Sequence, residues 1–171
     1  MHVTIVHLTE RADADHLDEG IVFAENQGKF GDGVEERRGT DFNADIDHLY
    51  RTLGPAFVRR GNARNGEKRV PWIEVDPSKT DELFVEPWNR FQEAVRQLAD
   101  STLADFMDGS SKVEDAMLTL RESYDFDWLY VVGEYGYAVS LAEWIRGLRR
   151  DADGGDGIRR FYVHASYDGD Q

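Results

Sequence analysis

The chain has 171 residues, which is the size of one ordinary domain and is long enough to bury a hydrophobic core. Its 34 acidic and 20 basic residues leave a formal net charge of −14, which argues against sequence-independent binding to nucleic acid or to an anionic membrane. The absence of cysteine excludes disulfide frameworks, thiolate metal sites and cysteine nucleophiles.

The first third of the chain predicts one strand, an irregular segment and one helix. A run of β-favouring residues from Val3 to Thr9 predicts an opening strand. Residues 12–39 are acidic and rich in glycine, so we expect mostly loop, with one short edge strand at residues 21–23. A helix is expected next, with Thr40 or Asp41 as its N-cap and Gly54 at its end. Its apolar residues recur at helical spacing: Phe42, Ile46, Leu49, Tyr50 and Leu53.

A β-hairpin is predicted around Asn65-Gly66, a dipeptide that favours a type I′ turn. Its strands would include residues 57–60 and 69–75. Because proline cannot donate a backbone hydrogen bond, Pro71 should confine the second strand to a sheet edge or a bulge.

Two helices follow, and their pattern predicts a helical hairpin. Residues 86–108 are expected to form one long amphipathic helix that ends at Gly109. Ser111 and Glu114 form a capping-box pattern for the next helix. We expect the apolar stripes of both helices to lie in the core: Phe84, Trp88, Phe91, Val95, Leu98, Thr102 and Phe106 on the first, and Val113, Met117 and Leu120 on the second.

The last third predicts a βαβ unit. Residues 128–132 are typical of a buried strand, residues 138–150 of a helix and residues 161–163 of a second strand. The two strands should be parallel, with a right-handed crossover, and lie beside the N-terminal strand. The fold class that follows is a single α+β domain: a small mixed β-sheet with a C-terminal βαβ unit, a β-hairpin excursion and three to four helices packed on the sheet.

No motif in the sequence has the spacing of a cofactor or metal site. The Gly133–Gly136 turn resembles an anion-binding loop, but Glu134 would repel a phosphate there. Residues 151–156 lack the ligand spacing of a calcium loop, and residues 28–33 lack that of a phosphate-binding loop. Asp41, Asp45 and His48 share a helix face, yet surface charge explains them equally well. We therefore expect no metal and no cofactor.

The most unusual local feature is a basic cluster in a chain of opposite overall sign, with Glu67 as its only acidic neighbour. Its members are Arg59, Arg60, Arg64, Lys68 and Arg69. Guanidinium groups bind phosphates and carboxylates bidentately, so the cluster is a candidate binding site. The alternative is an internal counter-charge to the protein's own acidic helices, or a solvated loop.

Acidic residues dominate the two central helices, and they can keep the protein soluble, dock on a basic protein surface or imitate the charge of nucleic acid. They are Glu86, Glu93, Asp100, Asp105, Asp108, Asp115, Glu122, Asp125 and Asp127. The sequence thus predicts a non-enzymatic interaction protein that binds a host protein with a basic surface, and not bulk nucleic acid or a membrane. Sixteen arginines against four lysines are typical of a GC-rich genome, which suggests an accessory or inhibitory factor of a virus or mobile element.

An enzyme is the alternative function: a small hydrolase or transferase acting on a phosphorylated ligand. Its site would combine Glu134, Tyr135 and His164 with the basic cluster. His7 and His164 would meet there if their strands are neighbours. No apolar run approaches the roughly 20 residues that cross a bilayer and the N-terminus lacks a signal-peptide pattern, so the expected location is the cytoplasm.

Overall fold

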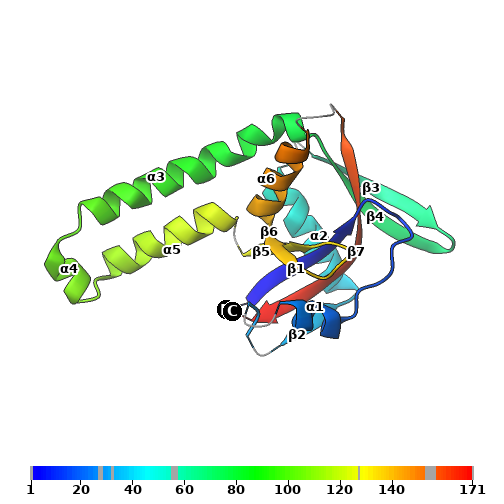
Figure 1. Cartoon of the computed structure of the whole chain (residues 1–171), viewed down its shortest axis with the longest axis horizontal. Coiled ribbons are helices and arrows are strands. Elements are labelled where there is room, and N and C mark those ends of the chain that lie inside the picture. Colours follow the sequence, from blue (N-terminus) through cyan, green and yellow to red (C-terminus); the bar gives the residue numbers. More distant parts are fainter. Residues whose placement is uncertain are drawn as a thin grey trace.

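The computed structural model confirms the α+β class, with a mixed seven-stranded sheet and helices on both of its faces (Figure 1). It describes residues 2–26, 29–31, 33–54, 58–126, 128–152 and 157–170. No helix among these residues has the length and apolar character needed to cross a bilayer.

The sheet is built around its longest strand. Across the sheet the order is β3 (Val58–Asn65), β4 (Lys68–Val75), β7 (Arg159–Asp170), β1 (His2–Thr9), β5 (Leu129–Val132) and β6 (Ala138–Ser140). The seventh strand, β2 (Val34–Arg37), pairs with the end of β7 on the same side as β4. The predicted opening strand is therefore confirmed as β1, which lies in the interior of the sheet.

The C-terminal βαβ unit is present, but its first strand differs from the prediction. β5 is parallel to β1, whereas β7 is antiparallel to β1, so β5 and β7 run in opposite directions. After β5 the chain turns back through Gly136 (φ 80°) and forms β6 antiparallel to β5. The parallel strands joined by helix α6 (Leu141–Ala152) are thus β6 and β7. The helix begins later than predicted because residues Ala138–Ser140 pair with β5 in the sheet. The Ser140 hydroxyl oxygen then accepts a hydrogen bond from the Glu143 amide at the start of the helix.

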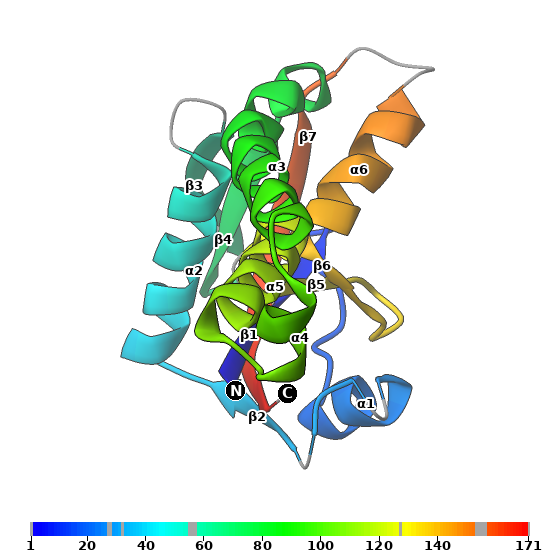
Figure 2. The same cartoon turned by 90° about the vertical axis from the view of Figure 1, so that its left-hand side faces the viewer.

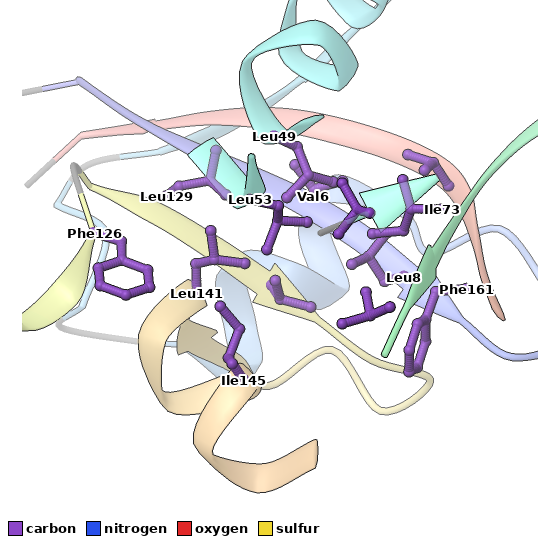
Figure 3. Packing of buried hydrophobic residues seen from close by; sticks show 14 of the residues in the cluster. Val6, Leu8, Leu49, Leu53, Ile73, Phe126, Leu129, Leu141, Ile145 and Phe161 are labelled. Carbon is purple, nitrogen blue, oxygen red and sulfur yellow. The ribbon is translucent and has the colours of Figure 1, made fainter. Parts of the chain in front are cut away.

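Two hydrophobic cores lie on opposite faces of the sheet. Helices α2 (Thr40–Leu53) and α6 cover the face to which Val6 and Leu8 point (Figure 3). The short helix α1 (Glu19–Glu25) covers the other face, to which Val3 and Ile5 point. This division follows from the alternation of side chains along a strand.

Helix α2 matches its prediction in length and in buried face, with Ile46, Leu49 and Leu53 in the core. Its N-cap is Gly39 (φ 62°), not Thr40 or Asp41. It ends at Gly54 (φ 83°), where the positive φ is readily adopted only by a residue without a side chain.

Helix α1 occupies a segment in which the sequence favoured loop and an edge strand. The Asp18 carboxylate accepts a hydrogen bond from the Gly20 amide and caps the helix, and Val22 fills the core. The edge strand of this region is β2, about a dozen residues later than expected. Residues 27, 28 and 32 of this glycine-rich segment lie outside the described residues.

The predicted hairpin is formed by β3 and β4, but its turn is displaced by one residue. Asn65 pairs with Lys68, so Gly66 and Glu67 are the two turn residues. Gly66 has φ 60° and occupies the first position of the turn, as in a type II′ turn. The predicted type I′ turn would have placed it at the second position. Pro71 lies where β4 ceases to pair with β7, so its missing amide costs no ladder hydrogen bond there. Phe57, assigned to the first strand, lies outside the described residues.

The single long helix predicted for residues 86–108 is wrong. The 3₁₀ helix η1 (Pro77–Phe84) leads into α3 (Val85–Ala99), and a separate short helix, α4 (Leu103–Met107), follows. The break occurs because Thr102 and Asp105 form a capping box that starts a new helix. Helix α5 (Ser111–Asp125) begins at the predicted cap residue, because the N-cap is Ser110, one residue earlier, which makes no side-chain capping bond.

The predicted burial of the apolar stripes is also wrong for most of their residues, although Val113 is buried and Phe84 packs against the core. Trp88, Val95 and Phe106 are exposed, and among the described residues of α3 only Ala94 is fully buried. Helical periodicity identified the apolar side of α3 correctly, but α3 packs on α5 and not on the sheet. Phe91 packs within this pair of helices, with its ring stacked on Trp88 at 5.9 Å between centroids.

This arrangement predicts unequal effects of two large-to-small substitutions. Leu49→Ala removes a fully buried side chain and should lower the free energy of unfolding by about 2–5 kcal/mol, since a cavity remains. Trp88→Ala should cost about 1 kcal/mol or less, because more than half of the side chain already contacts water. Urea denaturation followed by circular dichroism measures both values. Equal losses would mean that the α3 stripe is part of the core.

Candidate functional site

Helices α3, α4 and α5 form a projecting arm, residues 85–126, that extends away from the sheet (Figures 1 and 2). Apart from Phe126 at its base, the buried side chains within the arm are small: Ala94, Val113, Ala116 and Ser123. Only two long helices pack on each other there, so each keeps part of its apolar surface in water. The exposed large apolar residues of the arm are Val85, Trp88, Val95, Leu103, Phe106, Met107, Met117, Leu118 and Tyr124.

The end of the arm concentrates this apolar surface. Leu103, Phe106 and Met107 on α4 are 77%, 69% and 73% exposed. Monomeric proteins rarely leave such a contiguous group of large apolar side chains in water unless it binds something. We call these three residues the arm tip.

Acidic residues surround the arm tip. Residues 85–126 contain nine acidic and four basic side chains, and residues 100–115 contain five acidic side chains and only Lys112 as a basic one. The arm therefore combines exposed apolar side chains with a negative rim, which is the anatomy of a protein-binding patch whose partner is basic.

The basic cluster is divided among different surroundings. The Arg60 guanidinium pairs with Asp47 of α2 and stacks on the Tyr50 ring, 4.5 Å from its centroid. For this residue the structure favours the counter-charge interpretation. Arg59 and Arg64 are exposed on β3 and make no ion pair with a described residue. Lys68 and Arg69 line a small pocket together with His164.

The residues of the alternative ligand site are only partly brought together. Glu134 follows β5, and Arg11 follows the neighbouring parallel strand β1. The pKa of the Arg11 guanidinium is raised mainly by Asp13 and to a smaller extent by the charge of Glu134, so Glu134 lies near Arg11. The Arg11 carbonyl in turn lies 2.9 Å from His164 Nε2. Tyr135 is 79% exposed and is not among the residues that line the pocket with Lys68, Arg69 and His164.

His7 and His164 do meet, on the neighbouring strands β1 and β7, with their ring centroids 5.3 Å apart. His7 is fully buried, and neither of its ring nitrogens has a hydrogen-bond partner among the described residues. Burial, reinforced by His164 and His16, lowers the pKa of His7 to about 4. Burial is also the main cause of the lowered pKa of His164. The imidazole of His7 is therefore neutral at pH 7.

The residues weighed as metal ligands are engaged otherwise. One carboxylate oxygen of the buried Asp45 accepts a hydrogen bond of 2.7 Å from the Ser166 hydroxyl. Its other oxygen accepts one of 3.3 Å from the Arg37 guanidinium. Burial nevertheless raises the pKa of Asp45. Residues 153–156 of the calcium-like loop lie outside the described residues. Within the described ranges, no group of three or more histidine, aspartate or glutamate side chains has the geometry to hold a metal ion.

A larger open cleft of about 1070 Å³ runs beside α6. Its charged side chains have both signs, and some of them contact their neighbours. Arg149 pairs with Asp81, while Arg146 lies over the Tyr124 ring at 4.2 Å and donates to the Tyr124 carbonyl. The cleft therefore presents no concentration of one charge to a ligand.

Comparison with protein-family models, with curated proteins and with solved structures found no match to this chain.

The sequence singled out Lys68, Arg69 and His164 and combined them in the alternative ligand site, but no local pattern showed that they share a pocket. The burial of His7 was also missed; the only available signal was its position in the alternating pattern of the opening strand. The exposure of the arm tip could not be read from periodicity, which locates an apolar face without showing what covers it.

Stability should fall as the pH is lowered through the titration range of His7. The folded pKa is about 4 and the ordinary value is 6.5, so the unfolded chain binds a proton over this interval while the folded protein does not. The contribution of His7 to the free energy of unfolding should therefore be at its maximum above about pH 6.5. Lowering the pH to 4 should reduce it by about 3 kcal/mol. The lowered pKa of His164 acts in the same direction.

Chemical denaturation of the wild type and of His7→Gln at several pH values measures this contribution. The variant should show a shallower loss between pH 6.5 and 4. Parallel curves for the two proteins would show that His7 is not buried as a neutral ring.

Proposed function

We propose that the protein is a non-enzymatic interaction protein that binds a host protein with a basic surface through its projecting arm, in the manner of an accessory or inhibitory factor. The observation that carries the proposal is the exposed arm tip within an acidic rim. Leu103, Phe106 and Met107 supply the apolar centre, and the surrounding carboxylates supply long-range attraction.

A second copy of the same chain is a poor fit to this surface. Symmetric pairing through the arm tips would bring two rims of five acidic residues together, in a chain whose net charge is already −14. A partner with a basic rim around an apolar groove satisfies both features of the arm at once. The proposal therefore commits to a different protein as the occupant.

The apolar centre should determine how long the complex lasts. Phe106→Ser with Met107→Ser should weaken binding by at least about tenfold, mainly by faster dissociation, because such anchors carry most of the affinity of an interface. The matched control is Ile21→Ser with Ile158→Ser, which removes two exposed apolar side chains outside the arm. Capture from a lysate of the natural host, quantified by mass spectrometry, compares the three proteins.

A partner that supports the proposal binds the wild type and the control but not the arm-tip variant. Equal capture by all three proteins would show that the arm tip is not the interface. Concentration-dependent dimers of the purified wild type that disappear in the arm-tip variant would replace the proposed partner with a second copy.

The acidic rim should determine how fast the complex forms. Neutralising Asp108, Glu114 and Asp115 should lower the association rate by about tenfold at low salt and leave dissociation nearly unchanged. Neutralising the exposed Glu35, Glu67 and Glu82 changes net charge equally at other places and is the control. Surface plasmon resonance with the captured partner at two salt concentrations gives both rates. If both triple variants lowered the association rate equally, net charge and not the position of the rim would determine that rate.

A further inference from the structure

A small pocket opens where the β3–β4 hairpin separates from β7. Pairing of β4 with β7 runs from Val75–Arg159 to Trp72–Tyr162 and stops at Pro71. Beyond this point the chain segment after β1 fills the gap, and the Asn65 side chain holds it by donating to the Ala12 carbonyl at 3.0 Å. A cavity of about 190 Å³ remains between these elements.

The charged side chains that line this pocket have one sign. Its walls are formed by Ala12, Ala14, His16, Phe42, Asn65, Lys68, Arg69, Val70, Pro71, Val163 and His164. None of these is a carboxylate, although acidic residues outnumber basic ones by 34 to 20 in the chain. The pocket is thus a local reversal of the protein's overall charge.

The two cations of the pocket are available to a ligand. Lys68 and Arg69 form no ion pair with any residue in the described ranges, whereas other arginines of the sheet, such as Arg37, Arg60 and Arg160, are paired with carboxylates. Two carboxylates near the histidines of the pocket have partners of their own. Asp13 pairs with Arg11 at 3.2 Å, and Glu36 lies 3.2 Å from Arg38 and 3.4 Å from His16.

His164 is positioned in the pocket by a β-bulge. His7 pairs with Ala165 and Leu8 with Val163, so His164 is the extra residue of β7. Its Nε2 lies 2.9 Å from the Arg11 carbonyl and 3.0 Å from the Thr9 hydroxyl oxygen. Because a carbonyl only accepts, Nε2 carries the hydrogen and Nδ1 is the nitrogen that is free to take up a proton. Burial lowers the pKa of His164, so at neutral pH this nitrogen is an acceptor; a phosphate bound beside it would favour its protonation and so gain an additional N–H.

The remaining walls are apolar. Phe42, Val70 and Pro71 contribute carbon surface opposite the polar side chains. The volume is below the range of about 300–1,000 Å³ that drug-sized ligands occupy, so a ligand must be small.

From this arrangement we propose that the pocket between β4 and β7 binds a small phosphate monoester, with the phosphate held by Lys68, Arg69 and His164 and its short carbon chain against Phe42, Val70 and Pro71. A phosphate monoester fits better than a carboxylate, because it offers three acceptor oxygens and nearly two negative charges to several converging donors. Binding does not depend on the arm, so this inference and the proposed interaction function stand or fall separately.

Propyl phosphate is a suitable probe, with inorganic phosphate and butyrate as comparators. Two-dimensional NMR titration of the whole chain should show propyl phosphate binding more tightly than either comparator and shifting the amides around Val70 and His164. Equal affinity for propyl phosphate and inorganic phosphate would contradict the role of the apolar wall. Equal affinity for butyrate would contradict the choice of phosphate.

Two double variants of the same hairpin separate the pocket from general charge. Lys68→Gln with Arg69→Gln should weaken propyl phosphate binding by at least about tenfold, since charge-assisted hydrogen bonds are lost. Arg59→Gln with Arg64→Gln changes net charge equally but lies outside the pocket lining, and should change affinity less than about twofold. Equal weakening in both would overturn the proposal in favour of nonspecific attraction to the hairpin.

A third variant tests the histidine. His164→Phe removes the ring nitrogens and should weaken binding, whereas the exposed His2→Phe should not. Thermal melts of each variant test whether the fold is retained. Unchanged affinity in His164→Phe would remove this residue from the site and overturn the proposed set of contacts.

Discussion

The extra residue in β7 is the constraint on which the sheet depends. Side chains alternate between the two faces of a regular strand, so Val163 and Ala165 would normally lie on the same face. Instead, Phe161 and Val163 pack under α2 and α6, whereas Ala165 and Tyr167 pack under α1. One inserted residue, His164, changes the phase between these two halves. Strands β1, β2 and β4 all pair with β7, so their registers are tied to this single irregularity.

The same irregularity explains where the sequence was informative. Helix α2 has uninterrupted helical periodicity and the β3–β4 hairpin has a strong turn signal in Asn65-Gly66, and both were predicted. The sequence indicated only residues 161–163 of the twelve-residue β7, because the bulge interrupts the alternation at position 164. The first strand of the βαβ unit was misassigned because Ala138–Ser140 continue directly into a helix. Lys68 and His164 are distant in the chain, and their proximity depends on strand order, which no local pattern encodes.

The proposed interaction and ligand surfaces occupy different parts of the molecule and have opposite signs. The arm and the β3–β4 hairpin lie at opposite ends of the fold (Figure 1). The arm joins apolar side chains to an acidic rim, whereas the pocket beside the hairpin gathers the unpaired Lys68 and Arg69. Such separation lets a highly acidic chain keep one site for an anion, because the cations are distant from the densest carboxylates and screening by salt acts over about 10 Å.

The two ends of the arm meet at its base. Phe84, before α3, and Phe126, after α5, have their ring centroids 5.0 Å apart, and both contact the core under α6. Phe126 adopts a left-handed backbone (φ 56°), and the burial of its ring offsets the strain. The intervening 41 residues leave and re-enter the domain at almost one point. Geometrically the arm is an insertion, so evolution can lengthen, shorten or resurface it, and thereby exchange one binding partner for another, while the sheet keeps its registers.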